Sequence, residues 1–214
     1  PFRADVVGDV IERAARLDRP AWVLSNHDFG HIGSRIGEHL LPAAATLLLT
    51  LPGAVFLYQG DEIGLLDGPG GDPPDDRYGR DRARHPMQWD SGPAGGFSTG
   101  TPWLPAVDPA TRNVADQRAD PDSLYSLHRR LIALRRGLRG GLDVVAVDPD
   151  GLLAYRRGDV LVALNLGVRP VAVAPHLPIG PSSGCQLGQV LLATPGAGDG
   201  RVLAPGAATI ARIA

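Results

Sequence analysis

The sequence predicts a mixed fold, α/β followed by all-β: the C-terminal part of a (β/α)8 TIM barrel and then a small antiparallel β-sandwich domain. Two apolar runs carry the barrel prediction, over residues 22–28 and 55–62, because each ends abruptly in polar side chains. A helix-length segment, from about Glu38 to Leu51, lies between them. Strand, helix and strand, with polar groups at the carboxyl ends of the strands, is typical of a parallel barrel that displays an active site.

The first half of the chain has local signals for each element of this barrel part. Apolar residues at helical spacing predict an amphipathic first helix, and Pro20 follows it. Pro52-Gly53 ends the second helix. The expected elements are a helix over residues 5–17, a buried strand over 21–24, a polar loop over 25–37, a helix over 38–51 and a strand over 55–58.

A long segment without periodicity, residues 67–109, follows the second strand. A loop of this length in a compact domain is usually functional or disordered. It contains Trp89, Phe97 and Trp103, and disordered segments rarely keep aromatic residues. We therefore expect an ordered loop folded over the barrel mouth. A further helix is predicted to begin with Asp120 as its N-cap and to end at Gly137, which would be the eighth barrel helix.

After Gly140-Gly141 the pattern changes from helical spacing to short apolar strands separated by turn signals. The predicted domains are therefore residues 1–140, the barrel part, and residues 141–214, the β-sandwich. The expected strands cover residues 143–147, 152–156 and 160–164, with weaker ones over 171–173, 189–192 and 207–213.

Composition excludes several classes of function. The formal net charge of -2 gives no reason to expect a nucleic-acid partner or a membrane surface. The single Cys185 excludes an intrachain disulfide framework and, with no visible signal peptide, favours a cytoplasmic setting. Met87 is the only Met, and a whole barrel needs about 250 residues. We expect the chain to be the C-terminal part of a longer enzyme, with the N-terminal part of the same barrel as its partner.

Three motifs carry a resemblance to a known family. Asn26-His27-Asp28 and Tyr58-Gln59-Gly60-Asp61-Glu62-Ile63-Gly64 each follow a predicted strand, and residues 79–90 contain Arg80-Asp81 and Pro86-Met87-Gln88-Trp89. These resemble the motifs around the seventh and eighth strands of the α-amylase superfamily of retaining glycoside hydrolases, in its α-glucosidase and oligo-1,6-glucosidase branch. The resemblance covers nearly the whole chain and is specific between Trp22 and Asp90.

The resemblance implies roles for the first motif. Asp28 matches the third acid of the family's catalytic site, which holds the 2- and 3-hydroxyls of the sugar and helps to distort its ring. An ionised carboxylate makes strong hydrogen bonds to such hydroxyls, and these can tighten in the transition state. His27 matches the neighbouring sugar-binding His, and Asn26 is expected to orient Asp28 or its loop. Taken alone, the tripeptide would more often be a polar turn that caps a strand; the apolar strand before it and the second motif about thirty residues later favour the functional role.

The other two motifs imply substrate contacts and supporting contacts. Arg80 matches the Arg that contacts the bound sugar, whereas Arg82 and Arg84 are expected to lie in solvent. Gln59, Asp61 and Glu62 are expected to support the eighth loop rather than to react. The alternatives are a solvated basic loop and a tight turn with solvated acids. Trp89 could be a sugar platform or could pack in the loop's core.

One position departs from the family pattern. Many members carry an Arg that reaches the substrate where this chain has His31. The imidazole can still donate to a hydroxyl, so we expect His31 to bind substrate and expect His31→Arg to be tolerated. Arg35, four residues further along, matches a family Arg for which a structural role is expected.

The resemblance implies hydrolysis of α-glucosidic bonds of short oligosaccharides with retention of configuration. In the family the nucleophile and the acid/base follow the fourth and fifth strands, and neither region is in this sequence, so the chain alone is expected to be inactive. A transglycosylating relative, such as a trehalose synthase, and a non-catalytic sugar-binding scaffold remain as alternatives. No cofactor and no metal are expected, and the expected partner is an oligosaccharide substrate.

Overall fold

The computed structural model describes residues 2–70, 76–177 and 187–213, and their packing forms two compact units. The first unit combines residues 2–22, 42–55 and 130–213, and it contains most of the sheet structure. The second unit combines residues 23–41 and 56–129. The predicted domain boundary at residues 140–141 stays a prediction. Cys185 lies outside the described residues.

The predicted order of strand, helix and strand is present near the N-terminal end. Strands β1 (Ala21–Val23) and β2 (Ala54–Phe56) pair in a two-stranded sheet, and α3 (Leu41–Thr50) lies between them in the chain. A 3-10 turn, η1 (Glu38–Leu40), precedes α3 where we expected one continuous helix. The expectation that the first strand is buried is wrong, because Val23 is 50 % exposed. On β2, Phe56 is 59 % exposed.

The other helices match the sequence pattern in part. The first helix, α1 (Ala4–Ala14), ends three residues earlier than expected, and α5 (Leu124–Arg135) begins later. Ser123, not Asp120, caps α5, because its Oγ accepts the N–H of Ser126 at 3.1 Å. Two short helices lie where only loop or unassigned sequence was expected. Two 3-10 turns lie within the second and third sequence motifs. These are α2 (Ile32–Ile36), α4 (Val114–Ala119), η2 (Asp61–Ile63) and η3 (Arg80–Ala83).

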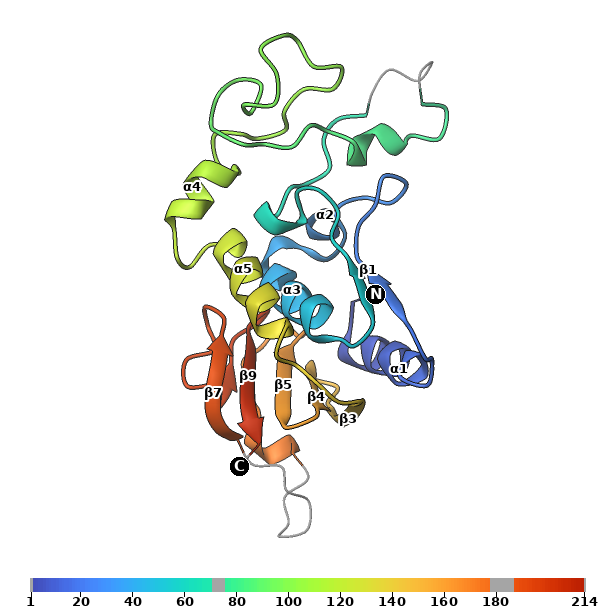
Figure 1. Cartoon of the computed structure of the whole chain (residues 1–214), viewed down its shortest axis with the longest axis vertical. Helices are drawn as coiled ribbons and strands as arrows, with labels where there is room; N and C mark the ends of the chain where they lie inside the picture. The colour runs from blue at the N-terminus through green and yellow to red at the C-terminus, as the bar shows by residue number, and fades with distance from the viewer. Residues whose placement is uncertain (1, 71–75, 178–186, 214) are drawn as a thin grey trace. The chain divides into compact units, whose positions relative to one another are not determined.

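The C-terminal region forms the predicted antiparallel sheet. Its strand order is β3-β4-β5-β9-β7, as Figure 1 shows. A second sheet pairs β6 with β8, a strand that the sequence pattern did not indicate, and a 3-10 turn, η4 (Ala174–His176), follows β6. The bounds are β3 Leu142–Val147, β4 Leu152–Arg157, β5 Val160–Asn165, β6 Val171–Ala172, β7 Leu187–Ala193, β8 Val202–Leu203 and β9 Ala208–Ile213.

The five-stranded sheet is covered on both faces. On one face Leu152 and Leu161 pack against Val171 and Leu203 of the smaller sheet, which gives the sandwich core. On the other face Tyr155 shares a hydrogen bond with Thr50 of α3, and α1 packs against β3 and β4. Strand β5 is wholly buried and β4 is buried except at Arg156, which fits the apolar runs of Leu152–Tyr155 and Val160–Leu164.

Two arginines close the C-terminal end of α3. Arg135 donates to the carbonyl oxygens of Leu49 at 3.0 Å, Leu51 at 2.5 Å and Gly53 at 2.6 Å. Arg157 donates to the carbonyl oxygen of Thr50 at 2.5 Å. Helix C-termini leave carbonyl groups without partners inside the helix, and cations are favoured there. Burial lowers the pKa of both guanidinium groups.

No helix among the described residues is long and apolar enough to cross a membrane. The long loop that follows β2 contains the 3-10 turn η3, and the helix α4 begins just after its expected end. Whether the loop lies over a barrel mouth stays a prediction.

Candidate functional site

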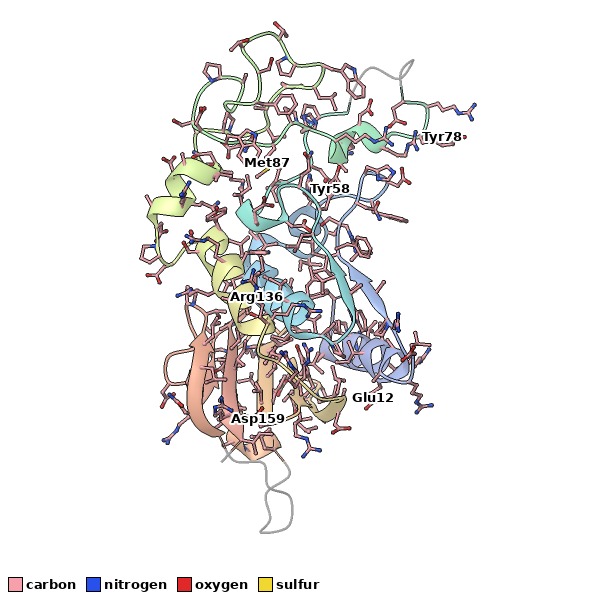
Figure 2. All side chains as sticks on the ribbon, in the orientation of Figure 1. Glu12, Tyr58, Tyr78, Met87, Arg136 and Asp159 are labelled. Carbon is pink, nitrogen blue, oxygen red and sulfur yellow. The ribbon has the colours of Figure 1, made fainter. Side chains whose placement is uncertain are left out.

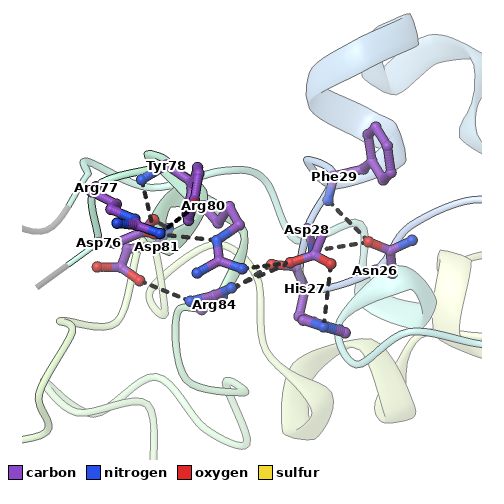
Figure 3. Close-up of polar contacts among 10 residues, drawn as sticks. All are labelled: Asn26, His27, Asp28, Phe29, Asp76, Arg77, Tyr78, Arg80, Asp81 and Arg84. Atoms are coloured by element: carbon purple, nitrogen blue, oxygen red, sulfur yellow. Dashed lines mark hydrogen bonds and ion pairs between the residues drawn. The ribbon is translucent and has the colours of Figure 1, made fainter.

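The Asn26-His27-Asp28 loop follows β1 directly and lies in the second unit. Asn26 Oδ1 accepts the backbone N–H groups of Asp28 at 2.8 Å and of Phe29 at 3.0 Å (Figure 3). An Asn side chain that bonds the backbone two residues on forms a tight local turn. This turn is the arrangement that the predicted orienting role of Asn26 requires, and it leaves the Asp28 carboxylate exposed.

Positively charged and polar groups surround the Asp28 carboxylate. Arg80 Nη1 lies 3.2 Å and Arg84 Nη2 lies 3.4 Å from Asp28 Oδ1, and His27 Nε2 lies 3.5 Å from Oδ2 (Figure 3). Both arginines come from η3 and the residue after it, more than fifty positions further along the chain. The side chain of Asp28 is still 46 % exposed, so a ligand can reach it. The structure thus brings Asp28, His27 and Arg80 together, although their roles remain predictions.

Arg80 is held in place by a buried carboxylate. Arg80 Nε donates to Asp76 Oδ1 at 3.2 Å, and the guanidinium carbon lies 5.0 Å from the centre of the Tyr78 ring. The hydrogen bond from Arg80 to Asp76, with the charges of Asp76 and Asp28, raises the pKa of Arg80. Burial opposes ionisation of Asp76, but hydrogen bonds from the Asp81 N–H and from Arg80 outweigh it and lower the pKa of Asp76. Asp76 and Tyr78 had no signal in the sequence.

Arg84 is a second residue that sequence reasoning missed. Its Nε donates to the carbonyl oxygen of His27 at 2.9 Å, and its Nη1 lies 3.4 Å from Asp81 Oδ1. The expectation of a solvated Arg84 is therefore wrong, because its side chain is only 23 % exposed and joins the η3 turn to the Asp28 loop. Arg82 is exposed, as expected.

The buried Ser25 lies just before the Asn26-His27-Asp28 loop and connects it to Asp61 and to Ile32. Ser25 Oγ donates to Asp61 Oδ1 at 2.6 Å and accepts the N–H of Ile32 at 2.9 Å. Ser25 and Asp61 are both buried. Asp61 therefore contacts the base of the loop rather than solvent, which supports its predicted role. The position of Ser25, thirty-six residues from Asp61, gave no signal in the sequence.

The geometry does not fit the predicted substrate contact of His31. The ring is completely buried, 5.3 Å from the Tyr58 ring and with Nδ1 4.0 Å from Asp61 Oδ1. Neither ring nitrogen has a hydrogen-bond partner among the described residues. A sugar hydroxyl cannot reach a side chain without accessible surface. Tolerance of His31→Arg was expected only for a His31 that faces the substrate; with the ring buried, the longer charged side chain would have to be buried. Arg35 donates to the carbonyl oxygen of Leu24 at 2.6 Å, a structural contact.

The motif after β2 contacts the long loop. Tyr58 donates to the carbonyl oxygen of Ala83 at 2.8 Å, and Gln59 donates to that of His85 at 2.9 Å. Burial raises the pKa of Glu62, which fits a supporting rather than a solvated acid. Met87, labelled with Tyr58 in Figure 2, is buried against Ile63 and Leu65.

Trp89 does not pack in the loop core, because its side chain is 52 % exposed. Of the two roles considered for it, the core-packing one does not fit this geometry.

The site has the chemistry of a polyol-binding carboxylate. A carboxylate flanked by fixed guanidinium donors and an exposed imidazole can accept from two neighbouring hydroxyls while the guanidinium groups bind their oxygens. Among the described residues, no group of three His, Cys, Asp or Glu side chains could hold a metal ion.

Known proteins resemble this chain over residues that include the candidate site. The family model for the alpha-amylase catalytic domain matches residues 8–139. The salivary alpha-glucosidase of Aedes aegypti is 35 % identical over 212 residues, which covers 81 % of this chain and 36 % of that protein. A probable oligo-1,6-glucosidase 2 of Bacillus subtilis is 33 % identical and covers 66 % of this chain and 33 % of that protein.

Solved structures resemble the whole chain. The trehalulose synthase MutB of Pseudomonas mesoacidophila has a TM-score of 0.81 and 26 % identity, covering 98 % of this chain and 46 % of that one. A MutB mutant in complex with its substrate sucrose has a TM-score of 0.82. These likenesses confirm the predicted fold class, part of a catalytic barrel followed by an antiparallel β region. The chain spans about a third of the curated relatives and about half of the solved chains.

Proposed function

This chain belongs to the alpha-amylase family of glycoside hydrolases and is alpha-glucosidase-like, and from that premise we propose that it forms part of a retaining α-glucosidase. The enzyme acts on α-glucosidic bonds of short oligosaccharides. Asp28 contacts the sugar at the cleaved bond, and His27 and Arg80 bind the same sugar. Asn26, Gln59, Asp61 and Glu62 keep these groups in position.

One observation carries the proposal: an exposed carboxylate at the end of β1, oriented by Asn26 and flanked by Arg80. Retaining glycosidases pass through an oxocarbenium-like transition state with positive charge on the sugar. A fixed negative charge beside that sugar stabilises the transition state more than the ground state. The nucleophile and the acid/base would come from the parts of the family barrel that this chain does not match.

A transglycosylating activity is the second candidate. The solved structures that resemble the chain include a trehalulose synthase, and one such relative was crystallised with sucrose. Hydrolysis and transfer use the same residues around the cleaved bond and differ in whether water or a sugar accepts the glycosyl group. Product analysis on maltose and sucrose distinguishes them, since transfer gives new disaccharides and hydrolysis gives monosaccharides.

Steady-state kinetics of the complete enzyme on maltose and isomaltose tests the proposal. We expect Asp28→Asn to lower turnover at least about a hundredfold, the size typical for losing one preorganised electrostatic group. Arg80→Ala should lower the specificity constant with a larger share in substrate binding. Asp143→Asn, at an exposed aspartate paired with Arg156 on the sheet, is the matched control and should leave both constants unchanged.

Two results would count against the proposal. Near-normal turnover in Asp28→Asn would mean that this carboxylate does not act at the cleaved bond. A complete enzyme that binds oligosaccharides but cleaves none would favour the non-catalytic scaffold. The 214-residue chain by itself should not cleave a nitrophenyl α-glucoside, because the reaction requires a pair of carboxylates.

A further inference from the structure

The long loop forms an open hollow on its surface that the Asp28 site does not use. It has a volume of about 870 Å³ and is formed by residues between Asp90 and Ala106. Pockets for small ligands typically measure about 300–1,000 Å³, so the hollow has the size of a binding site. It shares no residue with the group formed by residues 26–28 and 76–84.

One wall of the hollow is an aromatic ring. Trp103 lines it and is 66 % exposed, although Trp is usually well buried in folded proteins. A large aromatic side chain held open in a concavity offers a flat apolar face together with an N–H donor at its edge. That combination suits a ligand with one apolar face and polar groups around its rim.

The remaining lining offers neutral hydroxyls and one carboxylate. Asp90 Oδ1 accepts the N–H of Gly92 at 2.8 Å, which fixes the orientation of the carboxylate. At Gly96, whose φ is +65°, a Cβ atom would lie 2.4 Å from Asp90 Oδ2, so only a residue without a side chain fits against this carboxylate. Hydroxyl groups line the same hollow from Ser98, Thr99 and Thr101.

This lining selects against other ligand classes. None of the residues that form the hollow is basic, so a phosphate or carboxylate ligand would meet only Asp90 and lack a counter-charge. A single carboxylate is also too few ligands for a hard cation. A pyranose fits, because its C–H face is apolar and its rim carries hydroxyls that can bond both the carboxylate and the Ser and Thr side chains.

We propose that this hollow is a second sugar-binding site, which stacks one pyranose unit of an oligosaccharide on Trp103 and binds its hydroxyls through Asp90. The inference rests on the proposed function for its choice of sugar. It adds to that function a second sugar contact, at residues that the Asp28 site does not use, and a preference for oligosaccharides longer than maltose.

Calorimetric binding of maltotetraose and of maltose to the complete enzyme tests this inference. The Asp28→Asn background slows turnover during the titration. Adding Trp103→Ala or Asp90→Asn should weaken maltotetraose binding at least about tenfold, the loss expected for one stacked face or one charge-assisted hydrogen bond. Maltose binding should be unchanged. Phe97→Ala is the control, because Phe97 is an exposed aromatic on the same loop that does not line the hollow.

Kinetics in the Asp28 wild-type background separates the two proposals. Trp103→Ala should raise KM for maltotetraose about tenfold and leave kcat on maltose unchanged. Equal maltotetraose affinity with and without Trp103 and Asp90 would overturn the inference, whatever the enzyme cleaves. An enzyme that cleaves no glucoside, but whose maltotetraose binding still depends on Trp103, would overturn the proposed function and leave this site standing.

Discussion

The two compact units differ in the kinds of side chain that they bury and expose. In the five-stranded sheet the apolar residues of β4 and β5 are buried, and charged pairs such as Asp143 with Arg156 lie at the surface. In the unit that holds the candidate site, several carboxylates and imidazoles are buried while several large aromatic rings are exposed. The buried polar residues include Ser25, His31, Asp61, Asp76, Asp81, His85 and His128, and the exposed aromatics are Phe29, Phe56, Tyr78, Trp89, Phe97 and Trp103.

This difference indicates that buried residues stabilise the fold in the sheet and position other side chains in the site unit. Burial of apolar surface stabilises the sheet, at roughly 25 cal/mol for each Å² removed from water. Burial of carboxylates does not stabilise a fold unless each is paired and hydrogen-bonded. The site unit therefore uses its buried polar groups to fix the geometry of exposed ones. Mutations in the sheet should mainly lower the free energy of unfolding, and mutations in the site unit should mainly lower turnover.

The largest expected effect lies in the sheet core. Leu161 is almost fully buried, and Leu161→Ala removes methyl groups and leaves a cavity. We expect the free energy of unfolding to fall by about 2–5 kcal/mol, with unchanged turnover for each folded molecule. Urea denaturation of the variant checks the first expectation, and Val168→Ala, at an 83 % exposed position, should stay within about 0.5 kcal/mol. A loss of turnover without a loss of stability would break the comparison.

The next effect lies beneath the Asp28 loop. Ser25→Ala removes the donor to Asp61 Oδ1 and the acceptor for the Ile32 N–H, and leaves buried polar groups unpaired. Such a loss costs about 1–3 kcal/mol. We expect faster amide exchange at Asp28 and Ile32 together with lower turnover, whereas Ser91→Ala, at an exposed serine, should change neither turnover nor exchange at these two amides. Unchanged exchange between residues 25 and 32 would mean that Ser25 does not hold the loop.

A smaller effect depends on pH. Burial lowers the pKa of His128 below its ordinary value of 6.5, and the Leu124 carbonyl and Asp61 oppose this only in part. Because the folded pKa is depressed, the stabilisation is present above about pH 6.5 and is lost as the pH falls through the folded pKa. The free energy of unfolding should therefore decrease below pH 6.5, by at most about 1.4 kcal/mol per pH unit for one proton.

Denaturation curves between pH 7.5 and 5 check this expectation. His128→Gln should flatten the slope, and the exposed His39→Gln should not. Parallel slopes for the wild type and His128→Gln would show that His128 titrates alike in the folded and unfolded chain.

The smallest effect is expected for charges at the surface of the sheet unit. Arg13 and Asp9 pair at 2.5 Å on α1 with both side chains largely exposed. Exposed pairs of this spacing contribute about 0.3–0.5 kcal/mol. Asp9→Asn should change the free energy of unfolding by no more than that, measured by urea denaturation at low and high salt. A loss above about 1 kcal/mol would show that surface charges matter in this unit too.

Local patterns predicted the sheet well and the site only in part. Strands β3, β4 and β5 begin and end within a residue or so of the expected positions, because turn signals and burial are both encoded locally. The contacts of Arg84 with the Asp28 loop span more than fifty residues, and that of Ser25 with Asp61 spans thirty-six. No local pattern encodes such pairs. His31 was misplaced for the same reason, since its burial depends on Tyr58 and Asp61 rather than on its neighbours in sequence.

The two arginines at the end of α3 occupy positions where a lysine would not serve as well. All 21 basic residues are Arg, and between them Arg135 and Arg157 meet four successive or nearly successive carbonyls at the end of α3. A guanidinium offers five donors in a rigid fork, whereas an ammonium offers a single compact charge that loses its proton readily when buried. A lysine at either position would bind these carbonyls as a cation only while it kept its proton, so the contact would depend on pH. With arginine, the point where the chain leaves α3 and turns into β2 is held at every physiological pH.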